Sequence, residues 1–253
     1  MLVDIVAFVI NLAAASGRRR LMEAQLSLPG LPAFEIVSGV DGRALSGPEM
    51  DAVYDVRLAS RKLTMGEIGC ALGHCAVFER IVARDVPVAL VLEDDALIGH
   101  KLPSLLEKLR PQMDPARPQI VLLSHVERYS AWGMRRAGRK HRLARPYEAA
   151  GGHAYLLTRA AAAALLAAQR PVRNPPDAWC AFMDQGIVDV RCVVPYAVGT
   201  APAANASQIG DERLAYTDGT GIGPWLRKYL YQKLLFQILV KPVLRLKRQV
   251  SSW

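Results

Sequence analysis

Three adjacent carboxylates, Glu93, Asp94 and Asp95, follow an apolar run at residues 88–92. Three like charges at the end of a buried strand are costly unless a cation or hydrogen bonds offset their repulsion. Because side chains alternate along an extended chain, we expect Glu93 and Asp95 to point together and Asp94 to point away from them. Hard divalent cations bind carboxylate oxygens together with substrate phosphates. The pattern favours a metal–diphosphate site, and the alternative is a solvated acidic turn.

The elements that must position this cluster follow from the hydrophobic pattern of the chain. Strands and helices alternate, which predicts an α/β fold in which helices flank both faces of a mainly parallel sheet. Ligands of such sheets bind at the carboxyl ends of the strands, where we expect Asn11, the acidic triplet and Ser124-His125. The strands are expected at residues 5–12, 34–37, 86–92, 120–123, 154–157 and 192–197, the helices at 16–26, 64–83, 103–109, 158–169 and 177–186, and a basic, irregular loop at 128–145.

Polar side chains mark the expected starts of these helices. Ser16, Thr158 and Asp177 are each suited to cap a helix N-terminus. Thr64 and Glu67 have the spacing of a capping box, with a hydroxyl at the cap and a carboxylate three residues later.

Composition and charge are consistent with one domain and a basic tail. The chain has 253 residues, of which 51% are hydrophobic, and a net charge of +9. Residues 225–253 contain seven Lys and Arg and no acid, which leaves 9 − 7 = +2 for residues 1–224. A nucleic-acid-binding domain more often spreads its cations over one face, so no nucleic-acid partner is expected. We predict a domain at residues 1–218, a linker at 219–224 and a tail at 225–253.

The tail mixes aromatic, aliphatic and cationic side chains, which is typical of an amphipathic helix on an anionic membrane surface. The alternatives are a C-terminal helix that packs on the domain and a helix that forms a dimer. The apolar N-terminus predicts a first strand and not a signal peptide, and no run reaches the ~18 apolar residues of a membrane span. Four cysteines without zinc or disulfide spacing suggest reduced thiols. We expect a cytoplasmic protein that is peripheral on the inner face of the cell membrane.

Four stretches resemble glycosyltransferase family 25, which includes bacterial lipooligosaccharide β-galactosyltransferases and collagen galactosyltransferases. They are residues 9–12 with the arginines at 18–20, residues 63–74, residues 92–95 and residues 151–159. The resemblance implies a GT-A-like fold, inversion at the anomeric carbon, Mn²⁺ or Mg²⁺, and a UDP-sugar donor, with UDP-galactose favoured. It also implies a glycan or glycolipid acceptor such as lipopolysaccharide. The chain departs from the family pattern at Gly73, where serine is usual.

The resemblance also implies roles for individual residues. Asp95, with Glu93 or Asp94, would hold the metal. Donor contacts are implied for the set Asn11, Arg18, Glu67, His74, Asp94, His153 and Ser207, with Arg213 as a further candidate. Structural alternatives remain for several of them: a core histidine at 74, a loop residue at 153 and a solvated charge run at residues 18–20.

Inverting sugar transfer needs a base that takes the proton of the acceptor hydroxyl. Asp177 and Asp184 lie seven residues apart, about two helical turns, and are expected to share one helix face. We favour Asp184 as the base and Asp177 as a ligand of a sugar hydroxyl, with exchanged roles as the alternative. Purely structural roles are a helix cap for Asp177 and an exposed helix carboxylate for Asp184.

Two other functional classes compete with a glycosyltransferase. A metal-dependent nucleotidyltransferase or phosphohydrolase could use the same acidic cluster, but residues 11–17 do not form the Gly-rich phosphate loop that is usual in a nucleotidyltransferase. A non-catalytic membrane-bound partner module is the third hypothesis. The intact acidic triplet argues against it.

Overall fold

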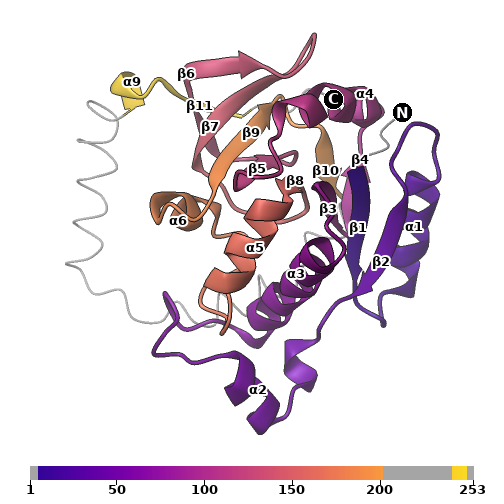
Figure 1. Cartoon of the computed structure of the whole chain (residues 1–253), viewed down its shortest axis with the longest axis vertical. Coiled ribbons are helices and arrows are strands. Elements are labelled where there is room, and N and C mark those ends of the chain that lie inside the picture. The colour runs from indigo at the N-terminus through magenta and orange to yellow at the C-terminus, as the bar shows by residue number, and fades with distance from the viewer. Residues whose placement is uncertain (1–4, 202–240, 250–253) are drawn as a thin grey trace.

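The computed structural model describes residues 5–201 and 241–249, and a nine-stranded sheet forms its centre (Figure 1). The strand order is β11-β6-β7-β9-β5-β8-β3-β1-β2. The pairings orient β2, β1, β3, β5, β9 and β6 in one direction and β8, β7 and β11 in the other. The large sheet is therefore mostly parallel in direction, although β8 runs antiparallel between β3 and β5. The strands are β1 Ile5–Asn11, β2 Phe34–Ser38, β3 Val88–Glu93, β5 Gln119–Leu122, β6 Arg128–Arg136, β7 Arg142–Glu148, β8 Ala154–Thr158, β9 Asp189–Val194 and β11 Leu246–Arg248.

Helices cover both faces of the sheet because its central strands are apolar on both sides. On one face, Phe8 of β1 packs in a cluster with Phe78 of α3 and Leu165 of α5. On the other face, Val9 packs in a cluster with Met22 of α1. Figure 1 shows α3 and α5 side by side. The helices are α1 Ser16–Leu26, α2 Gly47–Val53, α3 Met65–Ala83, α4 Leu102–Leu109, α5 Arg159–Ala168 and α6 Trp179–Asp184.

The predicted loop at residues 128–145 is wrong, because this segment contains β6 and the start of β7, which pair antiparallel. Its many arginines suggested a loop, but most of them, including Arg135, Arg136, Arg142 and Arg145, lie on exposed positions of strands near the sheet edge, where charge protects against unwanted pairing. Tyr129, Leu143 and Ala144 are buried and anchor the hairpin to the core.

Helix starts agree with the sequence at two of the four predicted caps. Thr64 accepts a hydrogen bond from the Glu67 backbone N–H, and Thr158 accepts one from that of Ala161. Ser16 is the first residue of α1 and does not cap it, and the cap of α6 is Ala178 and not Asp177. Five shorter elements among residues 5–201 were not predicted: helix α2, the strands β4 Ala96–Ile98 and β10 Val198–Thr200, which pair as a two-stranded sheet, and the 3-10 turns at Gly42–Ala44 and Arg110–Gln112.

The end of the predicted tail belongs to the sheet. Residues 202–240, which include the predicted linker and most of the predicted amphipathic helix, lie outside the described residues. After the short helix α9 Lys241–Val243, strand β11 pairs with β6. Gln249 is buried and donates to the Val193 carbonyl, so this end is fixed to the core. Among the helices of residues 5–201 and 241–249, none is long and apolar enough to cross a membrane.

Candidate functional site

A cavity of about 640 Å³ opens at the edge where β3, β5 and β9 end and the antiparallel β8 begins. This is the edge at which the sequence places the polar clusters, and the cavity has the size of a small-molecule site. Its walls come from segments far apart in the chain: α3, the turns after β3 and β5, the loop before β8, the turn before α6, and β10. Its lining residues include Glu67, Cys70, Glu93, Asp95, His125, Gly151, Gly152, His153, Asp177 and Tyr196.

Glu93, Asp95 and His153 converge in this cavity, and one ligand atom from each lies within 4.8 Å of the others. The Nδ1 atom of His153 is 3.4 Å from Asp95 Oδ1 and 3.7 Å from Glu93 Oε2. Asp95 Oδ1 and His153 Nδ1 are buried, and neither has a hydrogen-bond partner among the described residues. Two carboxylate groups and one imidazole suit Mn²⁺ or Mg²⁺, and a cation would satisfy both orphaned atoms.

The charge state of His153 reflects the negative field of this cluster. Burial alone would lower the pKa of His153, but the nearby carboxylates of Asp95 and Glu93 outweigh burial, so the net shift is upward. A protonated His153 partly neutralises the carboxylates, and a divalent cation could replace that positive charge.

Asp94 points to the other side of the chain, as the alternation along an extended segment predicts. Its Oδ2 accepts a 2.7 Å hydrogen bond from Asn11 Nδ2, and its Oδ1 is 3.2 Å from Arg18 Nε. Burial raises the pKa of Asp94, and Asn11 and Arg18 oppose that effect. Asp94 therefore ties β1 and α1 to the acidic turn. These three residues are not among those that line the cavity in the described part of the chain.

His74 of α3 orients the other side of the Glu93 carboxylate. Its Nε2 lies 3.4 Å from Glu93 Oε1, and its Nδ1 lies 2.6 Å from the hydroxyl of the fully buried Tyr155. Gly152 makes this arrangement possible, because a Cβ there would lie 2.7 Å from Glu93 Oε1 and 3.3 Å from His74 Nε2. His74 is thus a buried histidine behind Glu93, and its side chain does not line the cavity itself.

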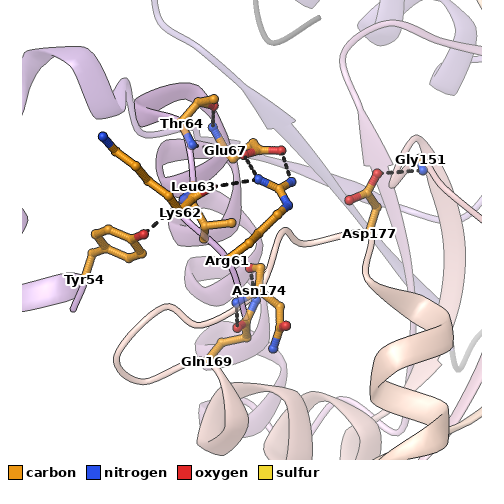
Figure 2. A network of polar contacts seen from close by, with 10 residues as sticks. All are labelled: Tyr54, Arg61, Lys62, Leu63, Thr64, Glu67, Gly151, Gln169, Asn174 and Asp177. Carbon is orange, nitrogen blue, oxygen red and sulfur yellow. Dashed lines mark hydrogen bonds and ion pairs between the residues drawn. The ribbon is translucent and has the colours of Figure 1, made fainter. Parts of the chain in front are cut away.

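Glu67 and Asp177 lie on different walls of the cavity (Figure 2). Glu67 is 1% exposed and forms two hydrogen bonds with the Arg61 guanidinium, at 2.6 and 2.9 Å, while its Oε2 also accepts from the Thr64 backbone. Its carboxylate thus completes the capping box of α3. Asp177 Oδ2 accepts a 2.8 Å hydrogen bond from the Gly151 backbone N–H, which holds the loop that carries His153.

Asp177 and Asp184 do not share a helix face. Helix α6 begins at Trp179, so Asp177 lies in the preceding turn and lines the cavity. Asp184 is the last residue of α6, is exposed and is not part of the cavity wall. Ser207 and Arg213, the other candidates from the sequence, lie outside the described residues.

Sequence reasoning assigned no role to several wall residues. Cys70 lies one helical turn before His74, and Tyr196 packs edge-on against His125 with ring centroids 5.7 Å apart. The position of Cys70 could have been found from its spacing to His74 on the predicted helix. Tyr196 carries no comparable signal, because it lies in the turn between β9 and β10.

Comparisons with known proteins give a consistent result. A family model described as "Glycosyltransferase family 25 (LPS biosynthesis protein)" matches residues 4–180. Procollagen galactosyltransferase 2 of Homo sapiens is 35% identical over 117 residues, which are 44% of this chain and 18% of that protein. Procollagen galactosyltransferase 1 of Danio rerio is 33% identical over 116 residues, or 42% of this chain and 19% of that protein. Inactive glycosyltransferase 25 family member 3 of Homo sapiens is 33% identical over 114 residues, with the same two shares.

The chain thus matches less than a fifth of the length of these relatives. Among solved structures, CMP:2-keto-3-deoxy-manno-octonic acid synthetase complexed with CTP gives a TM-score of 0.41 at 13% identity, and the match covers 84% of this chain and 99% of that one. A TM-score this low does not define a shared fold.

Proposed function

Because the chain belongs to glycosyltransferase family 25, we propose that it transfers a sugar, with galactose favoured, from a UDP-sugar to a surface glycan such as lipopolysaccharide. The proposal includes a GT-A-like mode of donor binding and inversion at the anomeric carbon. Two of the three relatives described above are named procollagen galactosyltransferases, which supports the choice of sugar.

One observation carries the proposal: Glu93, Asp95 and His153 meet in the cavity, and the buried atoms Asp95 Oδ1 and His153 Nδ1, 3.4 Å apart, make no hydrogen bond among the described residues. A nucleotide diphosphate brings negative charge, so a carboxylate cluster can bind it only together with cations. Glu93, Asp95 and His153 would hold Mn²⁺ or Mg²⁺. When bound, the ion would supply Lewis-acid stabilisation of the diphosphate leaving group.

Further donor contacts would come from the residues around Asp94, on the side of the acidic turn opposite Glu93 and Asp95. Arg18 lies beside Asp94 with its side chain half exposed, and it would supply positive charge to the diphosphate. Asn11 fixes Asp94 and thereby the path of the turn. Rigid support of this kind would help to hold the donor in line with the acceptor, and positioning of that kind lowers the barrier.

We assign the base to Asp177 rather than Asp184, because Asp177 lines the cavity and Asp184 is exposed outside it. Asp177 Oδ2 accepts from Gly151 N–H, which positions the carboxylate at the cavity wall, where it would take the proton of the acceptor hydroxyl. In that step the acceptor oxygen bonds to the anomeric carbon as the bond from that carbon to the diphosphate oxygen breaks.

Membrane binding would depend on the basic tail. Seven cations and no acid between residues 225 and 253 would favour an anionic membrane surface, where each contributes about 1 kcal/mol. A cytoplasmic protein that is peripheral on the inner face of the membrane would meet a lipid-linked acceptor there.

Thermal unfolding with nucleotide sugars tests the donor. The protein is heated with UDP, UDP-galactose, UDP-glucose or GDP-mannose, each with Mn²⁺ or with a chelator. A ligand that binds only the folded state raises the midpoint, so metal-dependent shifts with the UDP compounds and the largest shift with UDP-galactose are expected.

No shift with any nucleotide in the folded protein would overturn the proposal and favour a non-catalytic module. That alternative draws on one observation, the match to a relative named as inactive. Metal-dependent binding of UDP-galactose that leads only to hydrolysis of its diphosphate bond, with release of UMP and galactose 1-phosphate, would indicate a phosphohydrolase.

A further inference from the structure

A second group of metal-ligating side chains lies directly beside the first. The Sγ atom of Cys70, a ring nitrogen of His74 and a carboxylate oxygen of Glu93 all lie within 4.8 Å of one another. Cys70 and His74 are four residues apart on α3 and therefore project from the same face of that helix. Nothing in the proposed sugar transfer uses the thiol.

Glu93 belongs to both groups through different oxygens. Its Oε1 faces His74 Nε2 at 3.4 Å, and its Oε2 faces His153 Nδ1 at 3.7 Å. The first group offers sulfur and nitrogen, whereas the group with Asp95 and His153 is richer in oxygen. Because thiolate and imidazole ligands favour zinc and carboxylate oxygens favour Mg²⁺ and Mn²⁺, the two groups differ in the metals that they prefer.

The surroundings of Cys70, His74 and Glu93 suit a zinc ion with one open position. Cys70 and Glu93 line the cavity, so a fourth ligand can come from solvent or substrate. A metal on His74 Nε2 requires the ring proton on Nδ1, and there the hydroxyl oxygen of Tyr155, 2.6 Å away, can accept it. Gly152 contributes no side chain where a Cβ would lie 3.3 Å from Nε2.

We propose that Cys70, His74 and Glu93 form a zinc site adjacent to the proposed donor-metal site, and that zinc bound there inhibits sugar transfer. On binding, the Cys70 thiol loses its proton to solvent and the sulfur bonds to the ion. Glu93 then shares its charge with zinc and holds the neighbouring cation less strongly. The inhibition rests on the proposed function, whereas the zinc binding does not.

Cobalt(II) serves as the spectroscopic probe for binding. The full-length protein is freed of metal with a chelator, kept in a non-thiol reductant and titrated with Co²⁺. A thiolate-to-cobalt charge-transfer band in the near ultraviolet is expected, and added Zn²⁺ should abolish it. Cys70→Ser should lose the band, while Cys180→Ser, a change at the other half-buried cysteine, should keep it. A band that is absent from the parent, or that persists in Cys70→Ser, would overturn the site.

The second measurement is inhibition by Zn²⁺ of Mn²⁺-supported transfer from UDP-galactose. Cys70→Ser should raise the zinc inhibition constant by about tenfold or more. Loss of a residue that only hydrogen-bonds to a metal ligand weakens metal binding roughly 10–100-fold, and loss of a ligand itself should weaken it at least as much. If the protein transfers sugar but shows no cobalt band, the zinc site is ruled out and the proposed function is not. The band without activity under any condition supports the zinc site and counts against the proposed function.

Discussion

The Nδ1 atom of His74 lies 2.6 Å from the hydroxyl oxygen of Tyr155, and this buried contact fixes the ring whose other nitrogen faces Glu93. Burial raises the pKa of Tyr155 well above its usual value, so the hydroxyl stays protonated and, without zinc on the ring, can donate to Nδ1. The ring proton then lies on Nε2 and points at Glu93 Oε1. The three residues form a chain from the core to the acidic cluster.

Tyr155→Phe should therefore weaken metal binding as well as stability. An unsatisfied His74 Nδ1 in the core is expected to lower the free energy of unfolding by about 1–3 kcal/mol. Loss of this outer partner should weaken Mn²⁺ binding by roughly tenfold. Urea unfolding with a chelator measures the first effect, and a Mn²⁺ titration measures the second. Tyr129→Phe, at a buried tyrosine outside the cavity wall, is the control, and equal Mn²⁺ affinity in both variants would show that Tyr155 does not orient Glu93.

Asp95→Asn should remove the stabilisation by metal while leaving the metal-free protein folded. A cation at about 100 times its Kd stabilises the parent by roughly 2.7 kcal/mol, and the variant should show almost none of this. Differential scanning calorimetry with and without Mn²⁺ gives both numbers. Asp184→Asn removes the same charge from an exposed position, so this variant should keep the full effect. A normal response to Mn²⁺ in Asp95→Asn would rule out Asp95 as a ligand.

Asp177→Asn should lower kcat for transfer from UDP-galactose to lipooligosaccharide by about 10²- to 10⁴-fold, the usual contribution of a general base. The amide oxygen of the substituted side chain can still accept from Gly151 N–H, so the loop should stay in place and thermal stability should change little. Asp184→Asn should retain kcat to within about twofold, because that residue is exposed and outside the cavity. If Asp184→Asn instead lost far more kcat than Asp177→Asn, Asp184 would be the base.

Strand ends and one capping box were predictable from sequence because each depends on local chemistry. The apolar run before Glu93 fixes where β3 ends, and Thr64 with Glu67 fixes where α3 begins. Alternation along the chain then separates Asp94 from its neighbours. These local rules predicted the edge of the sheet at which the cavity lies.

Positions that depend on tertiary packing were not predictable in the same way. The spacing of Asp177 and Asp184 suggested one helix face, but Trp179 starts α6 by packing into the core and leaves Asp177 in the turn before it. The arginine-rich segment 128–145 pairs as a hairpin because its few buried residues meet the core, and its charge alone gives no sign of this. The junction of His74 with Tyr155 joins residues 81 positions apart.

Arg61→Met should destabilise the domain through Glu67. Removal of one partner from a buried pair costs about 3–5 kcal/mol, but Arg61 is 47% exposed and water can replace part of its interaction, so about 2 kcal/mol is expected. Urea unfolding measures the change. The matched control is Arg57→Met, which breaks the exposed pair with Asp55 and should change the free energy of unfolding much less, because water screens that pair. Equal effects would mean that burial of Glu67 does not matter.

Gly152→Ala should impair metal binding more than stability. The new methyl group would lie 2.7 Å from Glu93 Oε1, and the flexible end of Glu93 can move away at a cost of about 1 kcal/mol. That movement takes the carboxylate out of line with Asp95 and His153, so Mn²⁺ affinity should fall by about tenfold or more. Gly17→Ala, which meets no atom within 4 Å, should leave Mn²⁺ affinity unchanged and stabilise α1 by about 0.5 kcal/mol. If Gly152→Ala instead lost several kcal/mol of stability with normal Mn²⁺ affinity, the close approach of Gly152 would serve the core and not the placement of Glu93.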